Sequence, residues 1–160
     1  MAKQKPAEIH VDIIYGDTCP GQHTAPLAVE SSLASLREKL EASGLTVQAD
    51  TWQIPDSGDP YEGIEASMRE TTPPRLLKNG QPVEAGFTIP PTITGWASPA
   101  VLVNGVNVTG QEQAAAAFSS CSMKQPTQEL VTTVLDAAIE KAIGVRQQYT
   151  QDDGKRVQEL

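Results

Sequence analysis

Cys19 and Cys121 are the only cysteines of this 160-residue chain, and their thiols are its strongest candidates for nucleophilic or soft-metal chemistry. Cys19 lies in the run Gly-Asp-Thr-Cys-Pro-Gly, residues 16–21, which follows an apolar stretch and precedes a helix signal. Backbone N–H groups and the positive end of a helix dipole favour a thiolate at such a position. Cys19 is therefore a candidate nucleophile, and the alternative is a small apolar residue that fills a loop.

A local disulfide at Cys19 is excluded, because the sequence continues Cys-Pro-Gly-Gln and lacks the second cysteine of a Cys-x-x-Cys motif. What remains is monothiol chemistry, or exchange with Cys121 as the resolving thiol. Cys121 lies in a Ser/Met-rich turn before the last predicted helix. If the two thiols meet, they could form a reversible disulfide, which requires Cα atoms within about 7 Å. They could equally bind Cu(I) or Hg(II).

Four further residues are candidates for binding a substrate near Cys19. Thr18 is adjacent in sequence and could orient a substrate, although hydroxyl residues before a helix are usually capping groups. His23 could add a ligand or stabilise the thiolate, although a lone histidine in a first helical turn is more often a surface residue. Trp96 could form a wall of the pocket, and Ser98 precedes a proline that could present backbone groups. One cysteine and one histidine are too few for a structural zinc site, and no cofactor is expected.

The stretch from Thr94 to Gly105 contains the elements expected to face Cys19. It predicts a bend ending at Ser98-Pro99, a short strand over Ala100–Val103, an Asn-Gly turn and a second strand over Val106–Val108. Proline is acceptable at the first position of a strand, and an X-Pro bond can be cis where a turn demands it.

The N-terminal half predicts a βαβ unit. Alternating and then continuous apolar residues indicate a strand over Ile9–Tyr15. A helix should begin near Thr24–Pro26 and end at Gly44, and a second strand should cover Leu45–Ile54. A right-handed crossover would make these two strands parallel.

The middle of the chain is rich in proline and glycine. Tyr61–Glu70 is expected to form a short helix, and about residues 71–91 to form an insertion that carries a hairpin around Asn79-Gly80.

The C-terminal part predicts an alanine-rich short helix over Gln111–Phe118 and a long helix over Thr127–Ile143, ended by Gly144. The predicted domain spans residues 9–144, with a flexible N-terminus over 1–8 and a polar tail over 145–160.

Three motifs resemble those of a group of small thioredoxin-like proteins, some of them labelled as related to organomercurial lyases. They are Cys19-Pro20 after the first strand, the Ser-Pro-Ala-Val-Leu-Val-Asn-Gly hairpin of residues 98–105, and Ser120-Cys121. The resemblance implies a thioredoxin-like α/β fold, with a mixed central sheet flanked by helices on both faces. It also implies that the loop of Pro99 is a cis-proline loop facing Cys19. The catalytic aspartate of a lyase has no counterpart that can be assigned in this chain.

Composition narrows the range of partners. The chain has 12 basic and 20 acidic side chains, a formal net charge of −8, and no basic run, which argues against nucleic acid. No apolar run approaches the roughly 20 residues of a membrane span, and residues 1–8 lack the apolar segment of a signal peptide. We therefore expect a soluble cytoplasmic protein with no membrane partner.

The leading hypothesis is a thiol-based redox protein, a possible thiol-disulfide oxidoreductase, whose partner is a protein or small-molecule thiol or disulfide. Cys19 would be the nucleophile, Cys121 the resolving thiol, and Pro99 part of the substrate-binding loop. One alternative is a protein that holds a soft metal or organomercurial through the two thiolates. Another is a non-catalytic interaction module whose inserted hairpin docks a partner.

Overall fold

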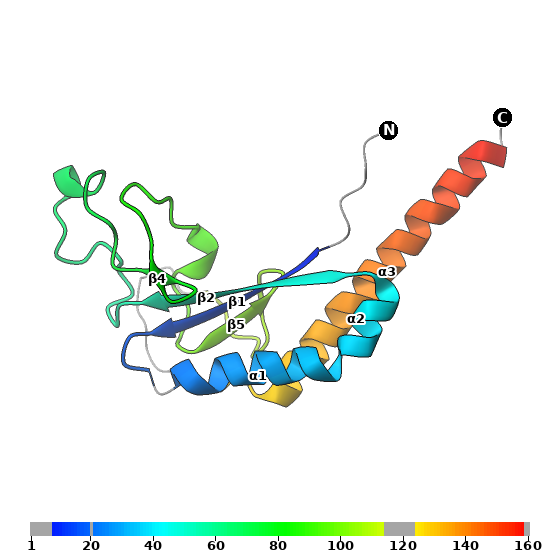
Figure 1. The fold of residues 1–160 in the computed structure, drawn as a ribbon, viewed down its shortest axis with the longest axis horizontal. Coiled ribbons are helices and arrows are strands. Elements are labelled where there is room, and N and C mark those ends of the chain that lie inside the picture. The colour runs from blue at the N-terminus through cyan, green and yellow to red at the C-terminus, as the bar shows by residue number, and fades with distance from the viewer. Residues whose placement is uncertain (1–7, 20, 114–123, 159–160) are drawn as a thin grey trace.

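A six-stranded mixed sheet forms the centre of the protein (Figure 1). The computed structural model describes residues 8–19, 21–113 and 124–158. The sheet has the order β4-β3-β2-β1-β5-β6, in which β1 and β2 are parallel and all other neighbours are antiparallel. The strands are β1 (Glu8–Gly16), β2 (Thr46–Ile54), β3 (Leu77–Lys78), β4 (Gln81–Pro82), β5 (Ala100–Val103) and β6 (Val106–Asn107).

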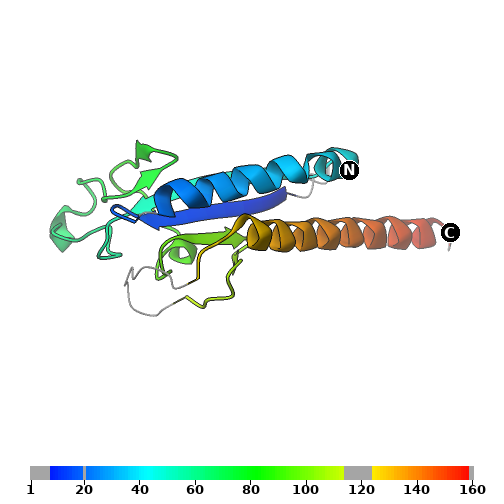
Figure 2. The same ribbon diagram turned by 90° about the horizontal axis from the view of Figure 1, so that it is seen from below.

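The two long helices cover one face of this sheet. Helices α1 (Gly21–Ser35) and α3 (Gln128–Gln158) lie side by side beneath the strands (Figure 2), and the short α2 (Arg37–Ser43) follows α1. At the α1–α3 contact, the fully buried Ser32 hydroxyl accepts a hydrogen bond of 2.8 Å from the Thr132 hydroxyl. The core on this face is apolar and includes Ile9, Val11, Ile13, Val29, Val101, Val131, Leu135 and Ile139.

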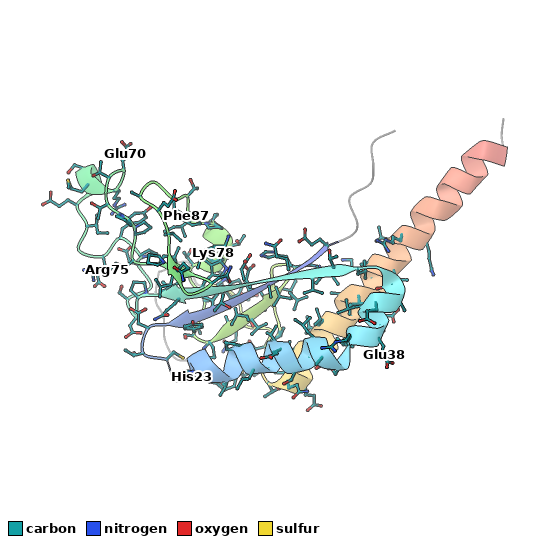
Figure 3. The ribbon with its side chains drawn as sticks, in the orientation of Figure 1. His23, Glu38, Glu70, Arg75, Lys78 and Phe87 are labelled. Carbon is teal, nitrogen blue, oxygen red and sulfur yellow. The ribbon has the colours of Figure 1, made fainter. Side chains whose placement is uncertain are left out.

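The opposite face is covered by the irregular segment 55–96. The residues buried there come from the sheet and from this segment: Ile14, Trp52, Ile54, Leu76, Val83, Ile93, Ala100 and Leu102. Figure 3 places Lys78 and Phe87 on this side and His23 and Glu38 on the helices of the other. Within the described residues, the expectation of helices on both faces is therefore wrong. The mixed α/β sheet itself is confirmed.

The helix predicted over Tyr61–Glu70 is absent apart from a 3-10 turn over Ala66–Met68. Gly63 has a φ of 75°, and none of residues 61–70 is buried. Without an apolar face to bury, a segment of this length gains too little from packing to form a helix.

Two helix boundaries also differ from the prediction. The first helix is interrupted at Leu36, so that α1 and α2 are separate, and Gly44 then ends α2 with a left-handed φ of 67° as predicted. Gly144 does not end the last helix, which continues to Gln158 and extends away from the sheet (Figure 1). A glycine in a helix interior costs only about 1 kcal/mol, which is too little to stop a helix already formed.

Both predicted Asn-Gly hairpins are confirmed, and they use the same hydrogen bonds. Asn79 and Asn104 have φ values of 52° and 49°. Asn104 donates its N–H to the His10 carbonyl (2.8 Å) and accepts the His10 N–H at Oδ1 (2.9 Å). Asn79 makes the same pair of bonds to Thr51, at 2.7 and 2.8 Å. Each turn thus anchors itself to one residue of the neighbouring strand, β1 or β2.

Two predicted segments lie partly outside the described residues. They are the Gln111–Phe118 helix, which is described only to residue 113, and the N-terminal segment 1–8, of which only Glu8 is described. Among the described residues, no helix is long and apolar enough to cross a membrane.

Two replacements of Asn104 should separate the stability that its side-chain hydrogen bond contributes from the cost of its left-handed backbone. Asn104→Ala should lower the free energy of unfolding by about 2 kcal/mol, because it removes a hydrogen bond and places a Cβ-bearing residue without a polar side chain at positive φ. Asn104→Gly loses the same bond without the steric cost and should lower it by about 1 kcal/mol. Urea unfolding measures both values. Equal losses in the two variants would contradict the assigned role of the left-handed backbone.

Candidate functional site

Cys19 lies at the end of the loop that joins β1 to α1. Its N–H donates a 3.2 Å hydrogen bond to the Gly16 carbonyl, which closes a tight turn directly after the strand. The residue is 6% exposed, and α1 begins two positions later, at Gly21. The predicted placement of Cys19, between a buried strand and a helix N-terminus, is therefore confirmed.

An open groove of about 630 Å³ leads to Cys19 on the helix-covered side of the sheet. One wall is the first half of α1 and the other is the segment that enters α3. All of the described residues that line it are uncharged: Cys19, Thr24, Leu27, Ala28, Ser31, Ser98, Gln125, Pro126, Thr127 and Gln128. The groove therefore suits a neutral ligand or chain segment that can reach a thiol.

The Ser98-Pro99 loop lies against the same turn. The peptide bond between these residues is cis, and both residues are buried. The Ser98 hydroxyl accepts a hydrogen bond of 2.9 Å from the Gly16 N–H and also lines the groove beside Cys19. A Cβ at Gly16 would lie 3.0 Å from Asp56 Oδ1, a tight contact that would push the Asp56 side chain by a few tenths of an ångström.

Thr18 holds the Cys19 turn to the segment that follows β2. Its N–H donates to Asp56 Oδ1 (3.2 Å) and its hydroxyl to Asp56 Oδ2 (2.7 Å). Hydrogen bonds to a carboxylate favour its charged form, and those from Thr18, the side-chain bond first, lower the pKa of Asp56. Both hydrogen-bonding groups of Thr18 are thus used to fix the loop. This matches the structural role that was the alternative to substrate binding for this residue.

The structure does not bring every predicted residue to the groove. Trp96 lines a separate small cavity of about 20 Å³ with Ile93 and Ser98, and its Nε1–H donates to the Thr92 carbonyl at 2.7 Å. His23 is exposed in the first turn of α1 and is not among the groove-lining residues. Cys121 lies outside the described residues. Among the predicted residues that the structure describes, Cys19 and Ser98 share the groove.

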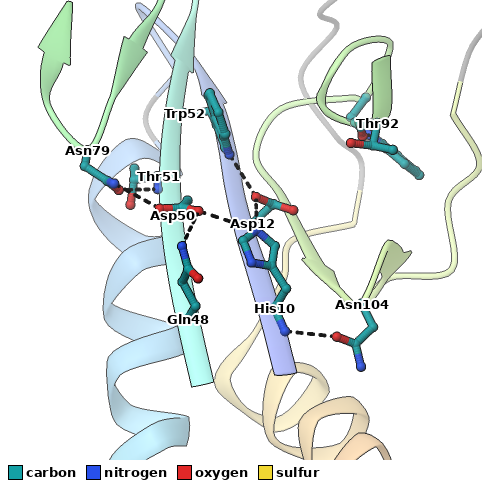
Figure 4. Close-up of polar contacts among 10 residues, drawn as sticks. His10, Asp12, Gln48, Asp50, Thr51, Trp52, Asn79, Thr92 and Asn104 are labelled. Carbon is teal, nitrogen blue, oxygen red and sulfur yellow. Dashed lines mark hydrogen bonds and ion pairs between the residues drawn. The ribbon is translucent and has the colours of Figure 1, made fainter. Parts of the chain in front are cut away.

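A second cluster of polar side chains was not predicted from the sequence. His10, Asp12 and Asp50 meet on the opposite face of the sheet (Figure 4). Sequence alternation indicated that His10 was structural or exposed, and nothing in it predicts which residue of β2 stands beside Asp12. The available signal was the charged Asp12 within an otherwise apolar central strand.

No protein-family model, curated protein or solved structure matches the chain.

The Thr18–Asp56 contact makes a prediction for pH dependence. In Thr18→Val the pKa of Asp56 should rise back toward its usual value of 3.8. Because the folded-state pKa is lowered, the contact stabilises the native state above the unfolded-state pKa, and this contribution is lost as pH falls through the lowered one. An NMR pH titration of the Asp56 carboxyl measures the shift, with Asp59 as the internal control. An unchanged Asp56 titration in the variant would refute the contact.

Proposed function

We propose that this protein performs thiol-disulfide exchange at Cys19, with a neutral segment of a thiol- or disulfide-bearing partner bound in the adjoining groove. The observation that carries the proposal is the position of Cys19 at the base of an open, uncharged groove. A buried thiol that no ligand can approach would be inert, whereas this one is reached from solvent between α1 and the start of α3.

The arrangement of elements supports a thioredoxin-like fold. Cys19 follows the first strand of a parallel βαβ unit, and the Ser98-Pro99 loop with the β5–β6 hairpin lies beside it. Figure 2 shows α1 and α3, the helices that border the groove, together on one side of the sheet. The position of Cys19 and the neighbouring Ser98-Pro99 loop is what the resemblance leads one to expect around a reactive cysteine, whereas the single helix-covered face departs from it.

The proposed exchange conserves atoms and electrons between Cys19 and the disulfide that it attacks. The Cys19 thiolate attacks one sulfur of a disulfide, the new sulfur–sulfur bond forms a mixed disulfide, and the other sulfur leaves as a thiolate. A second thiolate then releases Cys19 by the same reaction, so that no external oxidant or metal is needed. Cys121 or a thiol of the partner would supply this second thiolate, and a reducing compartment such as the cytoplasm would keep Cys19 free.

Hydroxyethyl disulfide, a small neutral probe, tests the proposal directly. Wild-type protein should form a mixed disulfide at Cys19, detected by peptide mass mapping, and Cys19→Ser should form none there. If Cys121 is the resolving thiol, Cys121→Ser should accumulate the mixed disulfide at Cys19. If a thiol of the partner resolves it, Cys121→Ser should behave as wild type. Wild-type protein that shows no exchange at any pH between 6 and 9, about the range in which thiols ionise, would overturn the proposal.

The neutral character of the groove gives a sharper prediction. Leu27 lines the groove and is 59% exposed, so Leu27→Asp introduces a carboxylate there without disturbing the core. The added negative charge disfavours the thiolate form of Cys19, which is the form that attacks the disulfide, and should slow exchange severalfold. Leu130→Asp is the matched control, because Leu130 is exposed but does not line the groove. Equal rates in the two variants, measured with hydroxyethyl disulfide, would show that the groove is not the route to Cys19.

A further inference from the structure

The cluster on the opposite face of the sheet joins one imidazole and two carboxylates. One donor atom from each of His10, Asp12 and Asp50 lies within 4.8 Å of the other two. His10 Nε2 is 3.0 Å from Asp12 Oδ1 and 3.5 Å from Asp50 Oδ2. Ligand atoms bound to one metal ion at about 2.0–2.2 Å lie about 3–4 Å from each other, so both distances suit shared coordination.

Strand register explains how residues 38 positions apart meet. In the parallel β1–β2 pair, Asp12 is the direct partner of Asp50, and His10 of Gln48. Side chains alternate between the two faces of a sheet. Ile9, Val11 and Ile13 pack in the helix-covered core, so His10, Asp12 and their β2 partners lie on the other face. The donors are thus fixed by the most regular part of the fold.

The charge of this cluster is poorly balanced. The Asp12 and Asp50 side chains are 10% and 8% exposed, and burial of two adjacent carboxylates is costly unless a cation compensates them. Within the described part of the chain, neither forms an ion pair with lysine or arginine. Lys78, the nearby cation on β3, instead stacks on the Trp52 ring at 5.1 Å. One imidazole therefore faces two buried negative charges.

Surrounding groups orient the carboxylates and contact three of their four oxygens, including Asp50 Oδ2, to which Gln48 Nε2 donates at 3.5 Å. The Trp52 Nε1–H donates to Asp12 Oδ1 at 2.9 Å, and the Asn79 Nδ2–H donates to Asp50 Oδ1 at 3.0 Å. Asp12 Oδ2 accepts no hydrogen bond from any described residue, and because no buried side-chain oxygen among these residues lacks a partner, Oδ2 is accessible to solvent or to a ligand. Partners of this kind fix metal ligands in place, and their loss typically costs about 10–100-fold in affinity.

We propose that His10, Asp12 and Asp50 bind a divalent first-row transition-metal ion such as Zn²⁺. One nitrogen and two oxygen donors suit a borderline ion better than Mg²⁺ or Ca²⁺, which prefer oxygen alone, or Cu(I) and Hg(II), which prefer sulfur. Three protein ligands leave at least one position for water or a ligand. The His10 side chain is 41% exposed, so an ion can reach the cluster from solvent on that side.

This site is independent of the thiol groove. The groove opens between α1 and α3, whereas the cluster lies on the face covered by segment 55–96. Because thiolates also bind Zn²⁺, the test uses the full chain with both cysteines replaced, Cys19→Ser/Cys121→Ser. If this protein binds no metal ion, the proposed exchange at Cys19 still stands. If wild-type protein shows no exchange, the proposed metal site still stands.

Isothermal titration of the double-serine protein with Zn²⁺ should show one ion per chain. His10→Gln, Asp12→Asn and Asp50→Asn, each made in the same background, should weaken binding at least about tenfold, since even loss of an orienting partner has that effect. Glu38→Gln removes an exposed carboxylate on α2 and should bind as the parent does. Titration with Mg²⁺ should show no comparable heat.

A second measurement guards against variants that fail to fold. Zn²⁺ should raise the melting temperature of the double-serine protein, and the rise should disappear in Asp12→Asn, whose own melting temperature shows whether it is folded. Co²⁺ bound to the same protein should give the d–d absorption of a nitrogen and oxygen site. Absence of Zn²⁺ binding to the folded parent, or binding that survives all three ligand replacements, would overturn the proposal.

Discussion

The fold depends on the position of β1 at the centre of the sheet. Its backbone is paired with β2 on one side and with β5 on the other, and both of its faces are covered. Most side chains on β1 therefore enter a packed environment, and a buried polar one such as Asp12 must find partners there. Ile9, Val11 and Ile13 meet this constraint by apolar packing against the helices. Asp12 meets it through hydrogen bonds with Trp52 and His10.

The same strand positions the candidate site at its C-terminal end. At Gly16 the backbone leaves the sheet, and its N–H binds the hydroxyl of Ser98. The next residues are held by Thr18, which binds Asp56 beyond the end of β2. Cys19 thus sits at a point where three segments far apart in sequence converge. Glycine at position 16 suits this convergence, since a Cβ there would lie 3.0 Å from the Asp56 carboxylate that holds Thr18.

Features set by local sequence were the ones that could be predicted. Asn-Gly between apolar runs specifies a tight hairpin because asparagine and glycine both accept positive φ, and both such turns form. The strand before Cys19 and the long final helix follow from apolar periodicity in the same way. These signals act over a few residues and need no knowledge of the rest of the fold.

Features set by long-range packing could not be predicted. The pairing of Asp12 with Asp50 depends on the register of two strands joined by two helices, which residue types do not specify. Trp96 could have formed a wall of the Cys19 pocket or anchored a loop, and residue types do not choose between these roles; its indole binds the Thr92 carbonyl and packs against the loop-covered core. The covering of one face by loops was likewise missed, because helix periodicity does not say which face a helix will pack on.

The inserted hairpin is best understood through its inward contacts. Asn79 binds both the backbone of Thr51 and the carboxylate of Asp50, and Lys78 stacks on Trp52, whose Nε1–H in turn binds Asp12. The insertion thereby completes the surroundings of the carboxylate pair that β1 and β2 bring together.

The outer strand of the hairpin presents little edge for pairing with another chain. β4 consists of two residues, and the second, Pro82, has no N–H to offer. A segment used mainly to dock a partner strand would be expected to display a longer, unblocked edge. Lys78 and Asn79 of the hairpin instead contact β2, which favours a role in holding the His10–Asp12–Asp50 cluster.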